Sequence, residues 1–146
     1  MTFRAVLIAG PTASGKSALA AALAQRFGGV VINADSMQVY RDLSVITARP
    51  TPEEMGDVPH HLYGHVDGAT NHSVAAYAAE AGALLDVLAR KGQMPVLVGG
   101  TGLYFKALTE GLSAIPPVPE AVRSSFRAHA AERTTGELHA ELSEQD

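Results

Sequence analysis

The feature that most constrains the fold of this chain is the segment GPTASGKS at residues 10–17. It follows the short apolar run RAVLIA at residues 4–9 and precedes KSALAAALAQRF at residues 16–27, which is rich in Ala and Leu. The pattern G-x-x-x-x-G-K-S/T between a buried strand and a helix is typical of a phosphate-binding loop. A glycine-rich turn with an incidental lysine is the alternative interpretation of the same residues.

The residue types of this loop suit phosphate binding. Gly10 and Gly15 allow the backbone to bend so that successive N–H groups point inward. The first N–H groups of the following helix lack partners and carry the positive end of its dipole. Lys16 supplies a charge for a terminal phosphate, and Ser17 a hydroxyl ligand for Mg²⁺. The loop alone does not distinguish phosphate transfer, hydrolysis and release of pyrophosphate.

The rest of the chain alternates short aliphatic runs with longer helical stretches, which predicts an α/β fold with a parallel sheet flanked by helices. Three strands are expected, with a possible fourth. This is fewer than an average sheet contains, so the expected sheet is incomplete. Residues 36–60 are expected to be irregular because of their prolines. The other expected strands are at 30–33, at 61–66 (the possible fourth strand) and at 95–98. Two further helices are expected at 74–91 and 101–110, the first of them capped by Ser73 and ended by Gly92.

Composition excludes several classes of protein. The chain is 47% hydrophobic, which suffices for a core, and it has no cysteine. A disulfide scaffold, a cysteine-ligated zinc site and a catalytic thiol are therefore excluded. The net charge of −4 argues mildly against a nucleic-acid binder that relies on bulk charge, although local placement matters more than the total. No apolar run is long enough to span a membrane, so we expect a cytoplasmic, soluble protein.

The proline-rich segment AIPPVP at residues 114–119 is the best candidate for a boundary. The residues after it are acidic and fit two amphipathic helices, whose apolar surface is too small for an independent domain. We therefore expect an α/β core at residues 1–114 and two further helices within residues 115–146. Because the chain stops inside a helical pattern, we expect it to be part of a longer protein.

Two strand ends carry candidate functional residues. Asp35 directly follows VVINA, and Gly99, Gly100 and Thr101 follow PVLV. Ligands bind at the carboxyl edge of parallel sheets, so Asp35 could act as a base or hold Mg²⁺ through water. The glycine pair would allow close approach of a ligand. The alternatives are that Asp35 caps a helix begun at Ser36 and that Thr101 is only a helix cap.

Four histidines occupy a polar stretch, and Gly64 and Gly68 argue against a helix there. We expect a strand or loop and favour ordinary polar side chains over a metal site. The helix at 74–91 is expected to serve packing only. The four are His60, His61, His65 and His72.

Several segments together resemble the tRNA dimethylallyltransferases. These segments are GPTASGKS, DSMQVYR at 35–41, TARPTPEE at 47–54, PHHL at 59–62 and LVGGTGLYFKAL at 97–108. They occur in the family's order and approximate spacing, and the resemblance covers residues 4–123. DSMQVYR and GGTGLY are far more specific than the phosphate loop. There are two departures, since Ile46 stands where the family usually has Gly and Arg49 where it usually has Lys.

The resemblance implies a fold like that of the P-loop NTPases and a reaction. The family transfers a dimethylallyl group from its diphosphate to N6 of the adenine beside the anticodon, on the 3′ side. The loop would hold the donor's diphosphate, with Mg²⁺ on Ser17 and with Lys16 stabilising the leaving group. Asp35 would be the general base, and Thr101 would be a catalytic residue as well. The loop residues are Gly10, Pro11, Thr12, Ala13, Ser14, Gly15, Lys16 and Ser17, and those facing tRNA are Asp35, Ser36, Met37, Gln38, Thr101 and Arg123.

The implied partner is the anticodon stem-loop of tRNA. The resemblance implies that residues 115–146 are the start of a helical insertion domain that clamps this stem-loop, and we expect a monomer. The family is about twice as long, so we expect residues 1–146 alone to be inactive. One alternative is an ATP-dependent small-molecule kinase, with Asp35 as base and Arg123 and Arg127 over the transferred phosphoryl group. The other is a non-catalytic phosphate-binding fragment.

Overall fold

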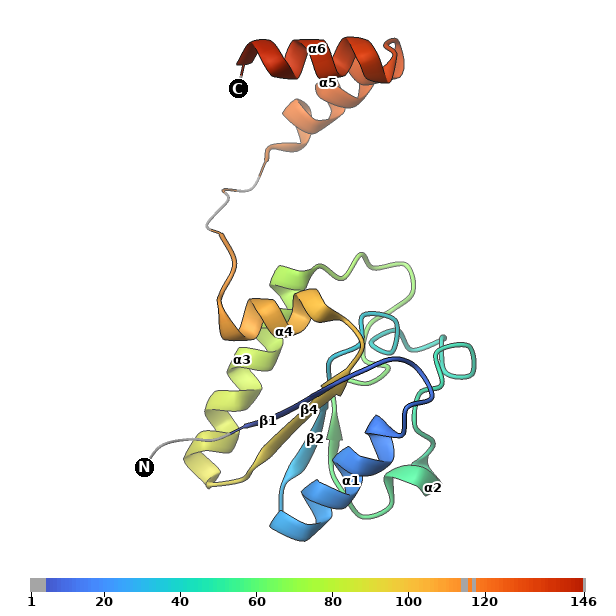
Figure 1. Ribbon diagram of the computed structural model, residues 1–146, viewed down its shortest axis with the longest axis vertical. Helices are drawn as coiled ribbons and strands as arrows, with labels where there is room; N and C mark the ends of the chain where they lie inside the picture. Colours follow the sequence, from blue (N-terminus) through green and yellow to red (C-terminus); the bar gives the residue numbers. More distant parts are fainter. Residues whose placement is uncertain (1–4, 114–115, 117, 146) are drawn as a thin grey trace. The chain divides into compact units, whose positions relative to one another are not determined.

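The computed structural model describes residues 5–113, 116 and 118–145 (Figure 1). The chain divides into two compact units, Met1–Leu112 and Ser113–Asp146. The expected boundary segment at 114–119 includes residues 114, 115 and 117, which lie outside the described residues, as does Arg4 at the start of the first expected strand.

The first unit is built on a parallel sheet of four strands in the order β1-β4-β2-β3. Every residue of β2 and β4 is buried, as expected for aliphatic runs covered on both faces. The possible strand at 61–66 is shorter than expected, because only His60 and His61 pair with β2, and Val66 makes a single bridge to Tyr40. The strands are β1 Val6–Ala9, β2 Val30–Asn33, β3 His60–His61 and β4 Pro95–Gly99.

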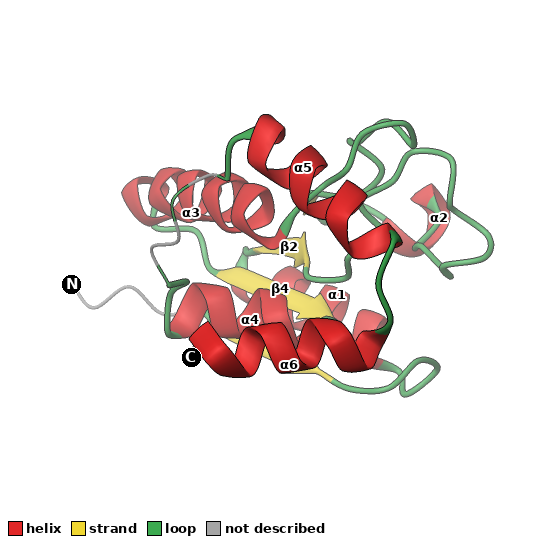
Figure 2. Cartoon of the chain, turned by 90° about the horizontal axis from the view of Figure 1, so that it is seen from above, coloured by secondary structure: helices red, strands yellow, loops and turns green. Residues whose placement is uncertain are grey.

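Helices cover both faces of this sheet (Figures 1 and 2). On one face Ala20 and Ala24 of α1 (Lys16–Phe27) pack against alternate residues of β2 and β4. On the other face Val30, Ile32 and Leu97 pack against Leu88 of α3 (Val74–Lys91) and against α4 (Gly102–Thr109). The α/β fold with a parallel sheet flanked by helices is confirmed.

The helix ends follow local signals. The Ser73 hydroxyl accepts a hydrogen bond from the Ala76 N–H at 3.1 Å, and α3 ends at Gly92 in the left-handed conformation, with φ 65°. The expected irregular stretch 36–60 contains a short helix, α2 (Pro52–Met55), that composition did not indicate. Thr51 and Glu54 form a capping box around it, a T-x-x-E signal that is present in the sequence.

The second unit is a pair of helices, α5 (Glu120–Ala131) and α6 (Thr135–Gln145), as expected from the amphipathic pattern. His129 on α5 and Arg133 between the helices lie 3.0 Å and 2.9 Å from the same carboxylate oxygen of Glu141. Phe126 and Leu142 are each 61% exposed, in keeping with the small apolar surface of this unit. Among the helices that the structure describes, none is long and apolar enough to cross a membrane.

Candidate active site

The phosphate loop joins β1 to α1 through two left-handed residues. Ala13 has φ 62°, and Gly15, at the N-cap of α1, has φ 80°. Because glycine has no side chain, the N-cap leaves the first N–H groups of α1 without a side-chain acceptor. Lys16 curls back over the loop, and its Nζ donates a hydrogen bond to the Pro11 carbonyl at 3.0 Å. The loop thus presents backbone N–H groups and an ammonium group together.

This loop lines a cavity of about 430 Å³. Residues 12–18 of the loop and of the first turn of α1 form one part of the lining, and Asp35, Gln38, Thr47 and Ala48 contribute to the rest. The structure therefore brings the phosphate loop and the end of β2 to one cavity at the carboxyl edge of the sheet, the edge where ligands bind in parallel α/β sheets.

Asp35 is half-buried and oriented by backbone hydrogen bonds. Its Oδ1 accepts a hydrogen bond from the Met37 N–H at 2.9 Å. Residues 36–39 form turns instead of a helix, so the alternative that Asp35 caps a helix begun at Ser36 is wrong. The carboxylate does hold the turn in place, as aspartates commonly do two residues ahead of a backbone N–H.

Thr101 joins the ends of β2 and β4. Its Oγ1 accepts a hydrogen bond from the Ser36 N–H at 2.9 Å and donates one to the Ser36 hydroxyl at 3.2 Å. Although Thr101 occupies the N-cap position of α4, its side chain makes no capping hydrogen bond. The alternative that it is only a helix cap is therefore wrong. Asp35, Ser36 and Thr101 are held together at the sheet edge, whereas Arg123 lies on α5 in the second unit.

For Gly99, the last residue of β4, the structure gives a reason other than the expected approach of a ligand. A Cβ added to Gly99 would lie 2.1 Å from the carbonyl carbon and oxygen of Ala34. The close approach at Gly99 is therefore between two backbones, at the point where strands β2 and β4 end. A Cβ at Gly100 would meet the Asp35 Oδ2 at 3.6 Å, which is ordinary contact.

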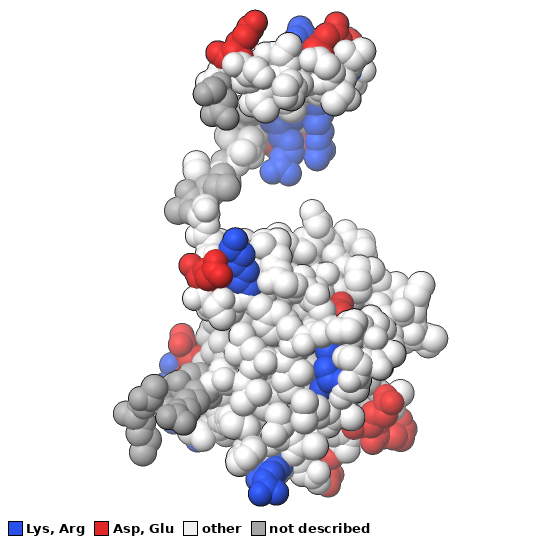
Figure 3. Space-filling view, viewed as in Figure 1, with Lys and Arg blue, Asp and Glu red and all other residues white. Residues whose placement is uncertain are grey.

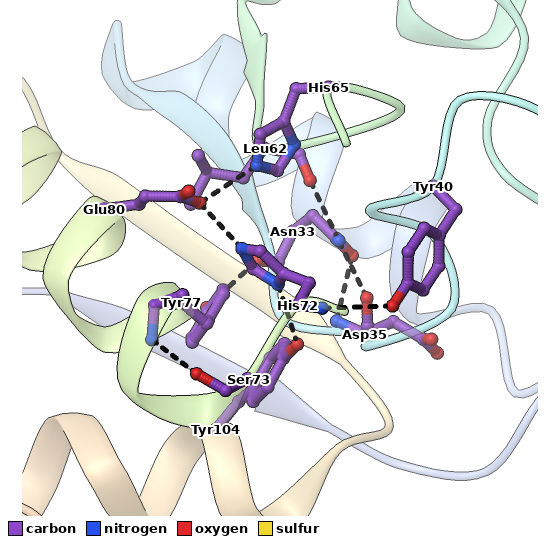
Figure 4. A network of polar contacts seen from close by, with 11 residues as sticks. Asn33, Asp35, Tyr40, Leu62, His65, His72, Ser73, Tyr77, Glu80 and Tyr104 are labelled. Carbon is purple, nitrogen blue, oxygen red and sulfur yellow. Dashed lines mark hydrogen bonds and ion pairs between the residues drawn. The ribbon is translucent and has the colours of Figure 1, made fainter. Parts of the chain in front are cut away.

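Behind Asp35 lies a buried polar network that the sequence analysis missed (Figure 4). The fully buried Asn33 donates from Nδ2 to the carbonyls of Asp35 and Leu62, at 2.9 and 3.0 Å, and its Oδ1 accepts from the Asp35 N–H at 2.9 Å. The Tyr77 hydroxyl donates to the Asn33 carbonyl at 2.9 Å, and its ring stacks on that of Tyr104 with centroids 3.7 Å apart. The sequence signal that could have indicated this network is Asn33 itself, a polar residue at the end of an otherwise apolar strand.

The loop after Asp35 is held by side chains. The Gln38 amide donates to the Thr47 carbonyl at 2.8 Å, and the Arg49 guanidinium donates to the carbonyls of Tyr40 and Arg41 at 3.0 and 3.2 Å. Arg49, which stands where the family usually has Lys, thus has a structural role here. The described non-glycine residues with positive φ are Ala13, Ala48 and Leu62. Ile46 is not among them, so its replacement of glycine requires no strained backbone.

Two of the four histidines are brought together beside α3, a helix that was expected to serve packing only. His65 and His72 both contact the carboxylate of Glu80 on α3 (Figure 4). His60 lies elsewhere, with its Nδ1 2.8 Å from the Val58 carbonyl. Partial burial, followed by the charges of His60 and Lys91, lowers the pKa of His61. The expectation that α3 serves packing only is therefore wrong for Glu80.

Comparison with known proteins identifies the family. The model of the family described as "IPP transferase" matches residues 38–146, about three quarters of the chain. The chain belongs to the IPP transferase family. This membership rests on a segment that begins after the phosphate loop, so it is independent of the loop motif.

Relatives within the IPP transferase family match the whole chain. It is 66% identical over 146 residues to a tRNA dimethylallyltransferase of Methylobacterium nodulans and 64% identical to one of another Methylobacterium species. Each match covers 100% of this chain and 48% of the relative, so the chain spans about half the length of these curated relatives.

Solved structures of IPP transferases share the fold. A full-length tRNA isopentenylpyrophosphate transferase from Bacillus halodurans is 39% identical, with a TM-score of 0.75 over 99% of this chain and 48% of that one. A eukaryotic dimethylallyltransferase acting on tRNA is 36% identical, with a TM-score of 0.72 over 80% of this chain and 28% of that one. The α/β unit therefore has the P-loop NTPase-like fold of these enzymes.

Proposed function

We propose that the protein containing this chain transfers a dimethylallyl group from dimethylallyl diphosphate to N6 of the adenine that follows the anticodon in tRNA. The observation that carries the proposal is the cavity shared by the phosphate loop and Asp35, in a member of the IPP transferase family. A diphosphate acceptor and a carboxylate base in one cavity suit a reaction in which diphosphate leaves while an amine loses a proton.

The phosphate loop would bind the diphosphate of the donor. When the allylic carbon–oxygen bond breaks, negative charge develops on the leaving oxygen, which the loop N–H groups and Lys16 can stabilise. Lys16 is restrained by a single backbone carbonyl, that of Pro11, so a diphosphate can compete for its ammonium group. The loss of one preorganised donor of this kind costs about 3–4 kcal/mol, or a factor of roughly 10²–10³ in rate.

Asp35 would act as the general base. The lone pair of the adenine N6 is delocalised into the ring, so the amine is a poor nucleophile until its proton is removed. Oδ1 of Asp35 is engaged by the Met37 N–H, which fixes the carboxylate and leaves Oδ2 to accept the proton. General-base catalysis of this type contributes about 10²–10⁴-fold.

Magnesium fits the donor set of the cavity. The Ser17 hydroxyl and the Asp35 carboxylate line the same cavity, and oxygen atoms of this kind are the ligands that Mg²⁺ prefers. Ser17 would hold the ion beside the diphosphate. When bound, Mg²⁺ supplies positive charge that neutralises the diphosphate oxygens.

The tRNA would approach from the side of Asp35. Ser36, Met37, Gln38 and Thr101 follow the strand ends, and Met37 is half exposed, so an unstacked base could meet these side chains. Bases of anticodon loops are single-stranded, which lowers the cost of extrusion. Lys and Arg side chains are scattered singly over the visible face of the first unit (Figure 3). We assign phosphate contacts to the helical part of the protein, which begins at α5 with Arg123.

The experiment uses the whole protein with an anticodon stem-loop and either dimethylallyl diphosphate or ATP. We expect prenylated RNA with the allylic donor only. Asp35→Asn should retain diphosphate binding and lose at least about 10²-fold in kcat, whereas Lys16→Ala should weaken diphosphate binding. Asp86→Asn, an exposed change on α3, is the matched control.

Two results would refute parts of this proposal. Phosphate transfer from ATP, without prenylated RNA, would replace the transferase by a kinase. A kcat of Asp35→Asn equal to that of the Asp86→Asn control would remove Asp35 from the role of base while leaving the transferase activity intact.

A further inference from the structure

Three side chains outside the proposed active site converge on one point (Figure 4). His65 follows β3, His72 precedes α3, and Glu80 lies two turns into α3. The Nε2 atoms of His65 and His72 lie 2.9 and 3.1 Å from the same oxygen, Oε2 of Glu80. One ligand-type atom from each residue lies within 4.8 Å of the other two. The proposed reaction makes no use of this cluster.

The spacing suits a first-row transition metal. Zinc binds histidine nitrogen and carboxylate oxygen at about 2.0–2.2 Å, so the ligand atoms of a tetrahedral site lie roughly 3.3 Å apart. The two distances to Glu80 are close to that value. The imidazole rings are 5.7 Å apart between centroids and are inclined by 88°. Two imidazoles that share one ion stand about 5–6 Å apart by the same bond lengths, so the separation of these rings is in the range that one shared ion requires.

The surroundings suit a metal ligand set as well. The side chain of His72 is 5% exposed, while those of His65 and Glu80 are 32% and 39% exposed, which leaves a route for an ion from solvent. The Nδ1 of His72 lies 3.5 Å from the Tyr104 hydroxyl, a partner that can orient the ring from behind.

We propose that His65, His72 and Glu80 form a binding site for a divalent transition-metal ion, with Zn²⁺ as the favoured ion and solvent completing its coordination. Two imidazoles and one carboxylate are a known zinc ligand set, and imidazole disfavours Mg²⁺ and Ca²⁺. The three residues lie outside the cavity used in the proposed transferase reaction.

The ion would fasten the loop between β3 and α3 to α3. That loop is already tied to the segment after Asp35, because Val66 bridges Tyr40 and the His72 N–H lies 3.3 Å from the Tyr40 hydroxyl. A metal at Glu80 would therefore stiffen the DSMQVY segment from behind. Its role in this proposal is to position the segment and not to contact a substrate.

Metal binding is tested on the whole protein, stripped with a chelator and titrated with Zn²⁺ by calorimetry and with Co²⁺ by visible absorption. We expect one ion per chain, micromolar or tighter affinity for Zn²⁺, a Co²⁺ spectrum typical of low coordination number and no competition by Mg²⁺. His72→Gln and Glu80→Gln should each weaken Zn²⁺ binding at least about tenfold. His139→Gln, an exposed histidine on α6, is the matched control.

Glu80→Gln also separates the metal site from a purely hydrogen-bonded cluster. A glutamine oxygen still accepts hydrogen bonds from both imidazoles, so this variant should remain folded by tyrosine fluorescence. Absence of Zn²⁺ binding by the unsubstituted protein would overturn the proposal and leave a hydrogen-bonded cluster. Binding that persists unchanged in His72→Gln and Glu80→Gln would place the ion elsewhere and would also overturn it.

Discussion

Replacement of Asn33 by alanine tests whether the buried network positions Asp35. The Asn33 side chain makes three hydrogen bonds, two with the backbone of Asp35 and one with the Leu62 carbonyl. A hydrogen bond of this kind contributes about 0.5–1.5 kcal/mol net, so the loss of three predicts a decrease of about 3 kcal/mol in the free energy of unfolding. Tyr77→Phe removes a single hydrogen bond, to the Asn33 carbonyl, and should cost about 1 kcal/mol.

Urea unfolding followed by tyrosine fluorescence is a suitable assay. Within residues 1–146 all four tyrosines lie in the first unit and there is no tryptophan, so the fluorescence of these residues, unfolded by themselves, reports on that unit alone. This matters because a two-unit chain need not unfold in one transition. A loss smaller than about 1 kcal/mol for Asn33→Ala would refute the reasoning, since it would mean that water replaces the three hydrogen bonds at little cost.

Activity of the same variant separates stability from positioning. Asn33 fixes both the N–H and the carbonyl of Asp35, whereas its hydrogen bonds do not reach the phosphate loop. Under conditions where Asn33→Ala is folded, we expect lower kcat for prenyl transfer with unchanged affinity for the diphosphate. A change confined to diphosphate affinity would contradict this positioning role.

Three further predictions concern local features of the first unit. Gly99→Ala should destabilise it by at least about 3 kcal/mol, because the new Cβ would overlap the Ala34 backbone, whereas Gly100→Ala should cost less than about 1 kcal/mol; equal unfolding midpoints would refute this. Ser73→Ala removes the cap of α3 and should cost about 1 kcal/mol in urea unfolding, and no loss would show that the cap is dispensable. The pKa of Glu80 in the folded protein lies below its ordinary value of 4.5. The ionised Glu80 therefore stabilises the folded state above pH 4.5, and this stabilisation is lost as the pH falls through the folded-state pKa. Glu80→Gln should therefore reduce the dependence of the urea midpoint on pH below about 4.5. An unchanged dependence in acid would contradict the lowered pKa of Glu80.

Most helices of this chain could be predicted from sequence because their signals are local. Helix α1 has the predicted bounds, 16–27, and α3 begins after Ser73 and ends at Gly92 as predicted. A cap or a left-handed glycine acts over three or four residues, so the sequence window contains the whole interaction. Among the described helices, α2 was not predicted from the sequence, although its capping box is an equally local signal.

The candidate site could be predicted only in part. The phosphate loop is contiguous, and Asp35 stands at the end of a recognisable strand, so both could be found without a structure. The sequence did not show that Thr101 bonds Ser36 across 65 residues or that Gly99 is required by the backbone of Ala34. Likewise, nothing in the polar stretch containing His65 and His72 pointed to Glu80.

The amino-acid sequence by itself determined the phosphate loop, the alternation of strands and helices and the resemblance to one enzyme family. The tertiary structure alone decided the strand order β1-β4-β2-β3, which sets β4 between β1 and β2 and brings Thr101 beside Ser36. It also decided the partners of Asn33 and of the two histidines. The physical reason is that helix caps and turns depend on neighbours along the chain, whereas strand pairing and buried polar contacts depend on segments that meet only when the core closes.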